Sequence, residues 1–152
     1  MESVRVRDFN ADDAASLVRL HRRNGRWFED GFMSEDFIHI TASRPDFRFF
    51  VADSDGEVVG FAGVLFFEGV GRAEFGPIVV DKRLRRRGLG TKLLNRGIRL
   101  LKAAGVHRVI VRVKSFNREA IMFFEENEFR KEVVLEGYTR NGESAVQLVR
   151  FI

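Results

Sequence analysis

A run of cations followed by glycines is the part of this sequence with the clearest chemistry. Five of the six residues from Lys82 to Arg87 are cationic, and Gly88 and Gly90 follow before an apolar helical pattern begins. A bend that leads into a helix turns unpaired backbone N–H groups outward, where the helix dipole adds about half a positive charge. Glycines let such a backbone contact an oxyanion closely. The segment predicts a phosphate-binding loop. A solvated charge run is the alternative, but it does not require the glycine pair.

Two well-known phosphate motifs do not fit this segment. A dinucleotide-binding loop has a third glycine where Leu93 stands, and it turns directly from strand to helix, whereas residues 81–87 intervene here. A P-loop has a longer gap between its glycines and a Gly-Lys-Ser/Thr ending, and the segment has neither. Nucleic-acid binding through Lys82–Arg87 is a further alternative. Because no aromatic residue lies among these cations to stack on bases, we expect no nucleic-acid partner.

The composition excludes several other kinds of chemistry. The sequence contains no cysteine, which rules out disulfides, thiolate zinc sites and an acyl-cysteine intermediate. Its three histidines lie at positions 21, 39 and 107 without ligand spacing, so we expect no metal site. No apolar run approaches the ~18 residues of a membrane span, and the N-terminus is too polar for a signal peptide. We therefore expect a cytoplasmic protein without a membrane partner.

Hydrophobic periodicity places the cationic bend between a strand and a helix. Strands are predicted at residues 3–9, 72–80 and 106–115, helices at 10–24, 34–43, 90–104 and 117–129, and hairpins at 47–69, turning at Asp55-Gly56, and at 130–152, around Asn141-Gly142. Residues 74–113 form one βαβ unit, so part of the sheet is expected to be parallel. We expect a single mixed α/β domain over residues 1–152, with a mostly antiparallel sheet of about seven strands, a parallel centre and about four helices.

Apolar spacing also predicts which side chains form the core. The first helix is expected to bury Ala14, Leu17, Val18 and His21 on one face, and the helix at 90–104 to bury Leu93, Leu94, Ile98 and Leu101. The sixteen phenylalanines, against one tyrosine and one tryptophan, are expected to lie mainly in the core because a phenyl ring has no polar tip.

A known family fits both the bend and a later helix. The segment from Arg85 to Gly90 matches the R/Q-x-x-G-x-G/A signature of the GNAT superfamily of acyl-CoA-dependent N-acetyltransferases. Residues 117–129 resemble the family's N-x-x-A-x-x-x-Y-x-x-x-G-F segment and supply Asn117, Ala120 and Phe129. The order of elements over residues 3–152 is also similar to that of the family. The resemblance implies a GNAT-like fold that uses acetyl-CoA as its acyl donor.

The resemblance also implies where acetyl-CoA binds. In the family the fourth and fifth strands splay apart, and the pantetheine arm lies between them like an added strand. The implied cofactor-binding residues are Ile78, Val79, Val80, Arg85, Arg86, Arg87, Gly88, Leu89, Gly90, Thr91, Asn117 and Phe124. The strand residues pair with pantetheine and the loop amides hold the pyrophosphate, where a side chain at Gly90 would intrude. For Asn117 the alternative is a helix N-cap and nothing more.

Two residues depart from the family pattern. Phe124 stands where the family usually has tyrosine, its common general acid, and Glu128 replaces a glycine. A phenyl ring cannot donate a proton. The CoA thiol resembles a cysteine thiol with a pKa of about 8.5, so it can leave without a strong acid. Tyr138 or a bound water is the alternative proton donor, and we expect the Phe124 ring to pack beside the pantetheine instead.

A base matters more than an acid, because an amine must lose its proton before it attacks. At pH 7 roughly one lysine-like amine in a few thousand is uncharged, compared with roughly one α-amine in ten. Glu74 is the candidate base. It lies eleven residues before Arg85, as does the catalytic glutamate of the histone-acetylating branch of the family, and strand alternation places it on the same face as Gly76 and Ile78. The alternative for Glu74 is an edge charge or ion-pair partner.

The predicted function is therefore direct transfer of an acetyl group from acetyl-CoA to a primary amine while both are bound. A backbone N–H near Ile78 or Val79 would polarise the thioester carbonyl. The acceptor is a peptide or protein amine or a small cationic amine, and the residues expected to contact it are Trp27, Phe28, Glu29 and Glu136. A non-catalytic acyl-CoA-binding sensor or regulator is the alternative, since the usual tyrosine is missing. A homodimer is a possible assembly.

Overall fold

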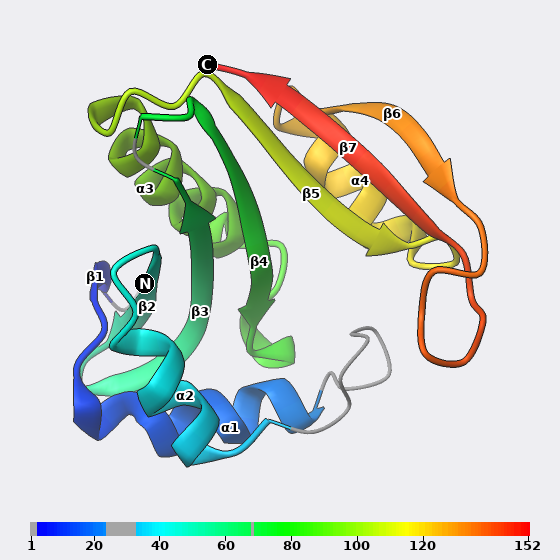
Figure 1. Ribbon diagram of the computed structural model, residues 1–152. Helices are drawn as coiled ribbons and strands as arrows, with labels where there is room; N and C mark the ends of the chain where they lie inside the picture. The colour runs from blue at the N-terminus through cyan, green and yellow to red at the C-terminus, as the bar shows by residue number, and fades with distance from the viewer. Residues whose placement is uncertain (1–2, 24–32, 68) are drawn as a thin grey trace.

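A single seven-stranded sheet organises the chain. The computed structural model describes residues 3–23, 33–67 and 69–152 (Figure 1). The strands are β1 (Val4–Asp8), β2 (Phe47–Ser54), β3 (Glu57–Phe66), β4 (Arg72–Val80), β5 (Arg108–Lys114), β6 (Arg130–Leu135) and β7 (Ala145–Phe151). They lie in the order β1-β2-β3-β4-β5-β7-β6, and only the β4–β5 pair is parallel among the described residues. The predicted mixed α/β fold, mostly antiparallel with a parallel centre, is confirmed.

Four α-helices in the described part of the chain cover the two faces of this sheet. They are α1 (Ala14–Arg23), α2 (Glu35–Ala42), α3 (Leu89–Ala103) and α4 (Arg118–Glu126). The helices α3 and α4 pack on one face, and α1 and α2 on the other. The side chains of Asn10 and Ser34 accept backbone hydrogen bonds ahead of α1 and α2, as expected of N-caps.

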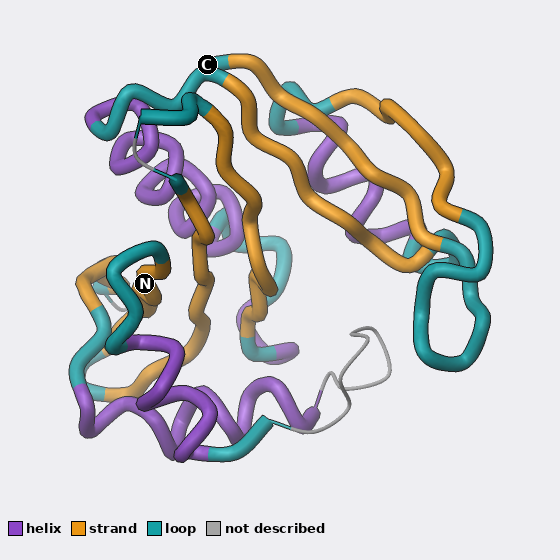
Figure 2. The backbone as a smooth tube through the Cα atoms, viewed as in Figure 1, coloured by secondary structure: helices purple, strands orange, loops and turns teal. Residues whose placement is uncertain are grey.

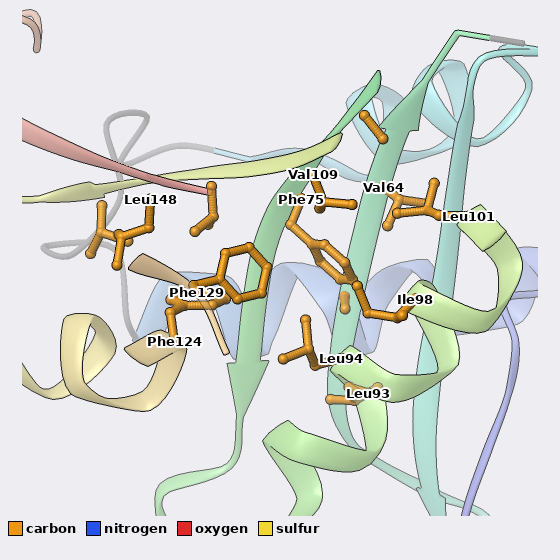
Figure 3. Packing of buried hydrophobic residues seen from close by; sticks show 14 of the residues in the cluster. Val64, Phe75, Leu93, Leu94, Ile98, Leu101, Val109, Phe124, Phe129 and Leu148 are labelled. Atoms are coloured by element: carbon orange, nitrogen blue, oxygen red, sulfur yellow. The ribbon is translucent and has the colours of Figure 1, made fainter. Parts of the chain in front are cut away.

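The larger core lies between the sheet and the helices α3 and α4. Figure 3 shows the predicted apolar face of α3 packed against Val64 of β3 and Phe75 of β4. The helix approaches closely at Gly97, where a Cβ atom would lie 2.3 Å from Cζ of Phe75. This packing fixes the position of α3, and hence of the loop that precedes it, relative to β4.

The smaller core on the other face corrects one detail of the prediction. The helix α1 buries Ala14, Leu17, Leu20 and His21, whereas Val18 is only partly buried. At 3.6 residues per turn, Val18 lies about 100° around the axis from Leu17, at the edge of the buried stripe. Leu20 falls within that stripe and was missing from the predicted face.

The parallel pairing that anchors the fold is short. The strands β4 and β5 pair only from Arg72–Phe75 to Arg108–Val111. Beyond that point the strands diverge, as Figures 1 and 2 show, while β4 continues to Val80 and β5 to Lys114. Both strands thus leave an unpaired edge toward each other, and the start of α3 lies beside this opening.

Candidate active site

The diverging strands enclose a cavity of about 850 Å³. Its lining comes from β4, β5, the loop before α3, and α4. Of the predicted cofactor-binding residues, which all fall within the described ranges, every one except Arg87 lines this cavity. Glu74 and Tyr138 line it as well. The structure therefore brings together residues that are up to 64 positions apart in the sequence, although their roles stay predictions.

Asp81 anchors the loop that follows β4. Its N–H donates to the carbonyl of Val59 at 2.8 Å, and its carboxylate accepts hydrogen bonds from the backbone and the guanidinium of Arg83. The hydrogen bond from the Arg83 guanidinium holds the pKa of Asp81 below its usual value. Arg83 also bonds to Glu57 of β3. One of the five loop cations thus fastens the loop to the sheet, a role that the sequence pattern did not indicate.

The backbone of the loop adopts a conformation suited to an anion. Arg86 and Gly88 both have positive φ, 65° and 79°. The first hydrogen bond of α3 runs from the N–H of Lys92 to the carbonyl of Gly88, so the N–H groups of residues 89–91 precede it. Left-handed residues in such a bend gather N–H groups into an anion-binding concavity. For Arg86 this conformation costs about 1–2 kcal/mol, a strain typical of binding sites.

The two glycines of the signature have different structural reasons. A Cβ atom at Gly88 would meet no described atom within 4 Å, so that position faces open space beside the loop. A Cβ atom at Gly90 would lie 3.0 Å from Cε1 of Phe123 on α4. Gly90 thus permits the close contact of α3 with α4, and the intrusion of a side chain at Gly90 on the pyrophosphate stays a prediction. The open loop around Gly88 stays part of the predicted pyrophosphate site.

The unpaired edge of β4 presents two of the three predicted backbone contacts. Residues of β4 alternate in the direction of their N–H and C=O groups along the antiparallel ladder with β3. The backbone N–H of Asp81 donates toward β3, so the backbone groups of Val79, two residues earlier, also point toward β3. The Val79 side chain is buried under α1. Ile78 and Val80 therefore direct their backbone groups toward the opening. Of the two candidates for a carbonyl-polarising N–H, the alternation favours Ile78.

Phe124 belongs to the core more than to the cavity. The residue is 5% exposed, and its ring centre lies 5.1 Å from that of Phe123. It lies 5.3 Å from the ring centre of Phe129, and Figure 3 shows these two rings side by side. One edge borders the cavity. The expected loss of cofactor contact on truncation is therefore secondary to a loss of core packing, which for Phe→Ala is about 3–5 kcal/mol.

Asn117 caps α4. Its side-chain oxygen accepts a hydrogen bond from the N–H of Ala120 at 3.1 Å, and the residue also lines the cavity. The capping role is thus present, and it leaves the amide NH₂ available for a contact with the cofactor arm, which stays a prediction.

Glu74 forms an ion pair with Arg112 of β5, at 3.0 Å between Oε1 and Nη1. Regular alternation had predicted that Glu74 and Ile78 share a face of the sheet, and this prediction is wrong. An extra residue in β4 forms a bulge there, because Val64 pairs with Phe75 whereas Ala62 pairs with Ile78. The bulge reverses the alternation, so Glu74 faces away from α3 and α4 while Ile78 packs toward them.

The predicted acceptor contacts are only partly placed. Trp27, Phe28 and Glu29 lie outside the described residues. Glu136 is exposed and does not line the described cavity. The sequence interpretation missed Arg112 and Lys114 of β5, which both line it. Their alternation with the buried residues Val109, Val111 and Val113 was the available signal.

The described residues contain no cluster of three or more side chains suited to a metal ion. Within the same ranges, no helix is long and apolar enough to cross a membrane.

A sheet that splays between β4 and β5, with a glycine-containing loop at the opening, is typical of the GNAT fold, and sequence similarity agrees. Residues 14–129 match the Acetyltransferase (GNAT) family, to which this chain therefore belongs. The chain is 32% identical to an N-alpha-acetyltransferase of Sulfurisphaera tokodaii, with 95% of this chain and 90% of that protein covered. It is 34% identical to a mycothiol acetyltransferase of Clavibacter michiganensis, with 87% and 44% covered.

The fold is similar to that of a solved structure as well. Ard1 from Thermoplasma volcanium superimposes with a TM-score of 0.87 at 23% identity, over 98% of this chain and 97% of that one. The chain spans 66% of the length of an uncharacterised N-acetyltransferase of Methanocaldococcus jannaschii, to which it is 27% identical, and 44% of the mycothiol acetyltransferase.

Proposed function

We propose that this chain is an acetyl-CoA-dependent N-acetyltransferase and that its acceptor is the N-terminal α-amine of a peptide or protein. The observation that carries the proposal is a single cavity that joins the anion-binding loop around Gly88, the unpaired edge of β4 and the carboxylate of Glu74. Membership of the GNAT family, whose usual donor is acetyl-CoA, supports the choice of donor.

The residues of the cavity divide the work between binding and polarisation. The thioester of acetyl-CoA supplies an activated acetyl group. The loop amides and the first turn of α3 bind its pyrophosphate, and Ile78 and Val80 hydrogen bond to its pantetheine arm as a neighbouring strand would. The N–H of Ile78 polarises the thioester carbonyl. Transfer is direct, with both substrates bound, because the sequence has no cysteine to carry the acetyl group.

An α-amine acceptor suits the proton chemistry of this site. Roughly one α-amine in ten is already uncharged at pH 7, so a base has mainly to take the proton that the nitrogen loses as it attacks. As the C–N bond forms, the C–S bond of the thioester breaks and CoA leaves as its thiolate, while Glu74 accepts the proton that the amine nitrogen loses. The Glu74 carboxylate lines the same cavity. Two kinds of relative support different acceptors. The N-alpha-acetyltransferase of Sulfurisphaera tokodaii matches 95% of this chain and is itself 90% covered, whereas only 44% of the mycothiol acetyltransferase of Clavibacter michiganensis is covered.

Thiol release from acetyl-CoA tests the function. We expect release with peptides that carry a free N-terminus, and much less with the same peptides blocked at the N-terminus, with polyamines or with free amino acids. Binding of acetyl-CoA without release for any acceptor would contradict the proposal. That outcome would favour a non-catalytic acyl-CoA sensor, the alternative raised by the missing tyrosine hydroxyl at position 124.

Glu74→Gln tests the base. The change keeps the shape of the side chain and removes its basicity. With a peptide N-terminal α-amine as acceptor, we expect turnover to fall by about 10²-fold, and the loss to shrink as the pH rises, because more of the amine is then already uncharged. A rate unchanged from about pH 6 to 9 would leave Glu74 only its ion pair with Arg112.

A further inference from the structure

Arg112 is the hub of a polar network on the face of the sheet that α3 and α4 leave open. Its Nη1 donates to Oε1 of Glu74 at 3.0 Å, and its Nε donates to Oε1 of Gln147 on β7 at 3.1 Å. Its guanidinium carbon lies 5.8 Å from the ring centre of Tyr138. Gln147 in turn donates through Nε2 to Glu132 on β6 at 2.8 Å. One side chain thus contacts both the candidate base and the candidate acid.

The position of Arg112 in β5 is where the opening begins. The last β4–β5 pair is Phe75 with Val111, so Arg112 is the first residue of β5 without a partner in β4. Its side chain reaches back across this vertex to Glu74, and both side chains are 32% exposed and line the cavity. The ion pair therefore joins β4 and β5 at the point where their backbone pairing ends.

The network holds the guanidinium from two sides. Gln147 can adopt only one amide orientation here, because its oxygen accepts from Arg112 while its NH₂ donates to Glu132. Arg112 then fixes one carboxylate oxygen of Glu74. The other oxygen, Oε2, has no hydrogen-bond partner among the described residues and is left to meet an amine.

Stability alone is a weak reason for this arrangement. Partly exposed ion pairs contribute about 0–1 kcal/mol to folding, so the pair changes the unfolding free energy little. A glutamate side chain that is otherwise free to rotate is a poor base, because a misplacement of about 1 Å can reduce turnover by about 10²-fold. Restricting the rotation of the Glu74 side chain at the vertex therefore affects turnover more than the ion pair affects the unfolding free energy.

We infer that Arg112 is a positioning residue, which orients the Glu74 carboxylate and the Tyr138 ring at the vertex of the opening. The inference rests on the proposed transfer to an amine, and it adds a residue that acts through Glu74 rather than on the substrates. Gln147 supports Arg112 in this role by fixing its Nε.

A double-mutant cycle tests whether Arg112 acts through Glu74. We expect Arg112→Gln to lower kcat for a peptide amine by about 10–100-fold, with the KM for acetyl-CoA within about twofold of the wild-type value. In a Glu74→Gln background the same change should alter kcat by less than about twofold, because the group through which Arg112 acts is already lost. Gln147→Ala, which keeps both charges of the ion pair, should lower kcat by a smaller factor.

The matched control is Arg96→Gln. Arg96 forms an ion pair with Asp8 at 2.8 Å and its side chain is 34% exposed, but it joins α3 to β1 away from the cavity. It should leave kcat unchanged. Thermal melts and the melting shift caused by acetyl-CoA confirm that each variant is folded, and Arg112→Lys replaces Arg112→Gln if the latter is not. The lysine keeps the charge but cannot hold Glu74 and Gln147 together, so its kcat should fall as well.

Two results would overturn the inference while leaving the proposed function intact. In one, the wild-type protein turns over, and the separate losses of kcat caused by Arg112→Gln and Glu74→Gln multiply in the double variant. The other is an Arg112→Gln loss no larger than that of Arg96→Gln. Absence of turnover in the wild-type protein, by contrast, refutes the proposed function itself and the inference with it.

Discussion

Gly88 provides the sharpest test of the anion-binding loop, because its backbone conformation can be altered without touching any neighbour. It has φ 79° and ψ 8°, and a Cβ atom there would meet no described atom within 4 Å. Gly88→Ala therefore introduces no clash. Its single effect is to make the left-handed conformation costly, by about 1–2 kcal/mol.

That cost appears in the affinity for acetyl-CoA if the loop must hold this conformation to bind pyrophosphate. A free energy of 1–2 kcal/mol corresponds to a dissociation constant about 5–30-fold higher. At an acetyl-CoA concentration 100 times the wild-type dissociation constant, ligand stabilises the wild-type fold by about 2.7 kcal/mol, and a tenfold weaker variant by about 1.4 kcal/mol. Calorimetric titration and thermal shift therefore measure the same loss independently.

Gly105→Ala is the matched control. Gly105 follows the other end of α3, has φ 80°, and likewise has open space at its Cβ position among the described atoms. It should lose about 1–2 kcal/mol of folding stability and no affinity, because the conformation of Gly105 is not needed to bind the ligand. If Gly88→Ala binds acetyl-CoA within twofold of the wild-type protein, or if both variants lose affinity equally, the loop around Gly88 does not bind the pyrophosphate.

Three further predictions concern the departures from the family pattern and the surface network. Phe124→Tyr should change turnover by less than about threefold, under ~0.7 kcal/mol on the barrier, because amine deprotonation limits the rate; a tenfold gain in the thiol-release assay would contradict this. Glu128→Gly should raise the urea-unfolding free energy by about 1 kcal/mol, because Glu128 has φ 70° and pays the left-handed cost. Hydrogen bonds from Arg108, chiefly, and Gln147 lower the pKa of Glu132 to about 2. Its stabilising contribution, present above its usual pKa, should therefore disappear as the pH falls from about 4.5 to 2, and Glu132→Gln should remove this part of the acid dependence of the urea midpoint.

Local signals in the sequence predicted most of the fold. The Asp55-Gly56 turn has positive φ at both residues, as a two-residue hairpin requires, and it joins β2 to β3. The spacing of Leu93, Leu94 and Ile98 predicted the buried face of α3. Each of these depends on neighbours within a few positions, which a linear pattern contains.

Several features that the sequence did not indicate depend on contacts between different elements of the fold. Nothing near Gly90 indicates that Phe123 of α4 packs against it. The core position of Phe124 depends on Phe129 and on the strands beneath α4. Arg112 and Glu74 meet only because β5 is parallel to β4, and the spacing from Glu74 to the signature says nothing about the guanidinium that holds it.

The opening itself has a local origin that the sequence pattern concealed. In β4 the bulge opposite β3 falls at Gly76 and Pro77, between the last residue paired with β5 and the first residue aimed at the opening. A bulge bends its strand and increases its twist. This distortion acts at the position where β4 leaves β5. The same bulge reverses the alternation, which places Glu74 on the open face while Ile78 presents its backbone to the opening. One irregularity of two residues thus places the candidate base and the Ile78 side chain on opposite faces of β4, whereas regular alternation would have placed both on one face.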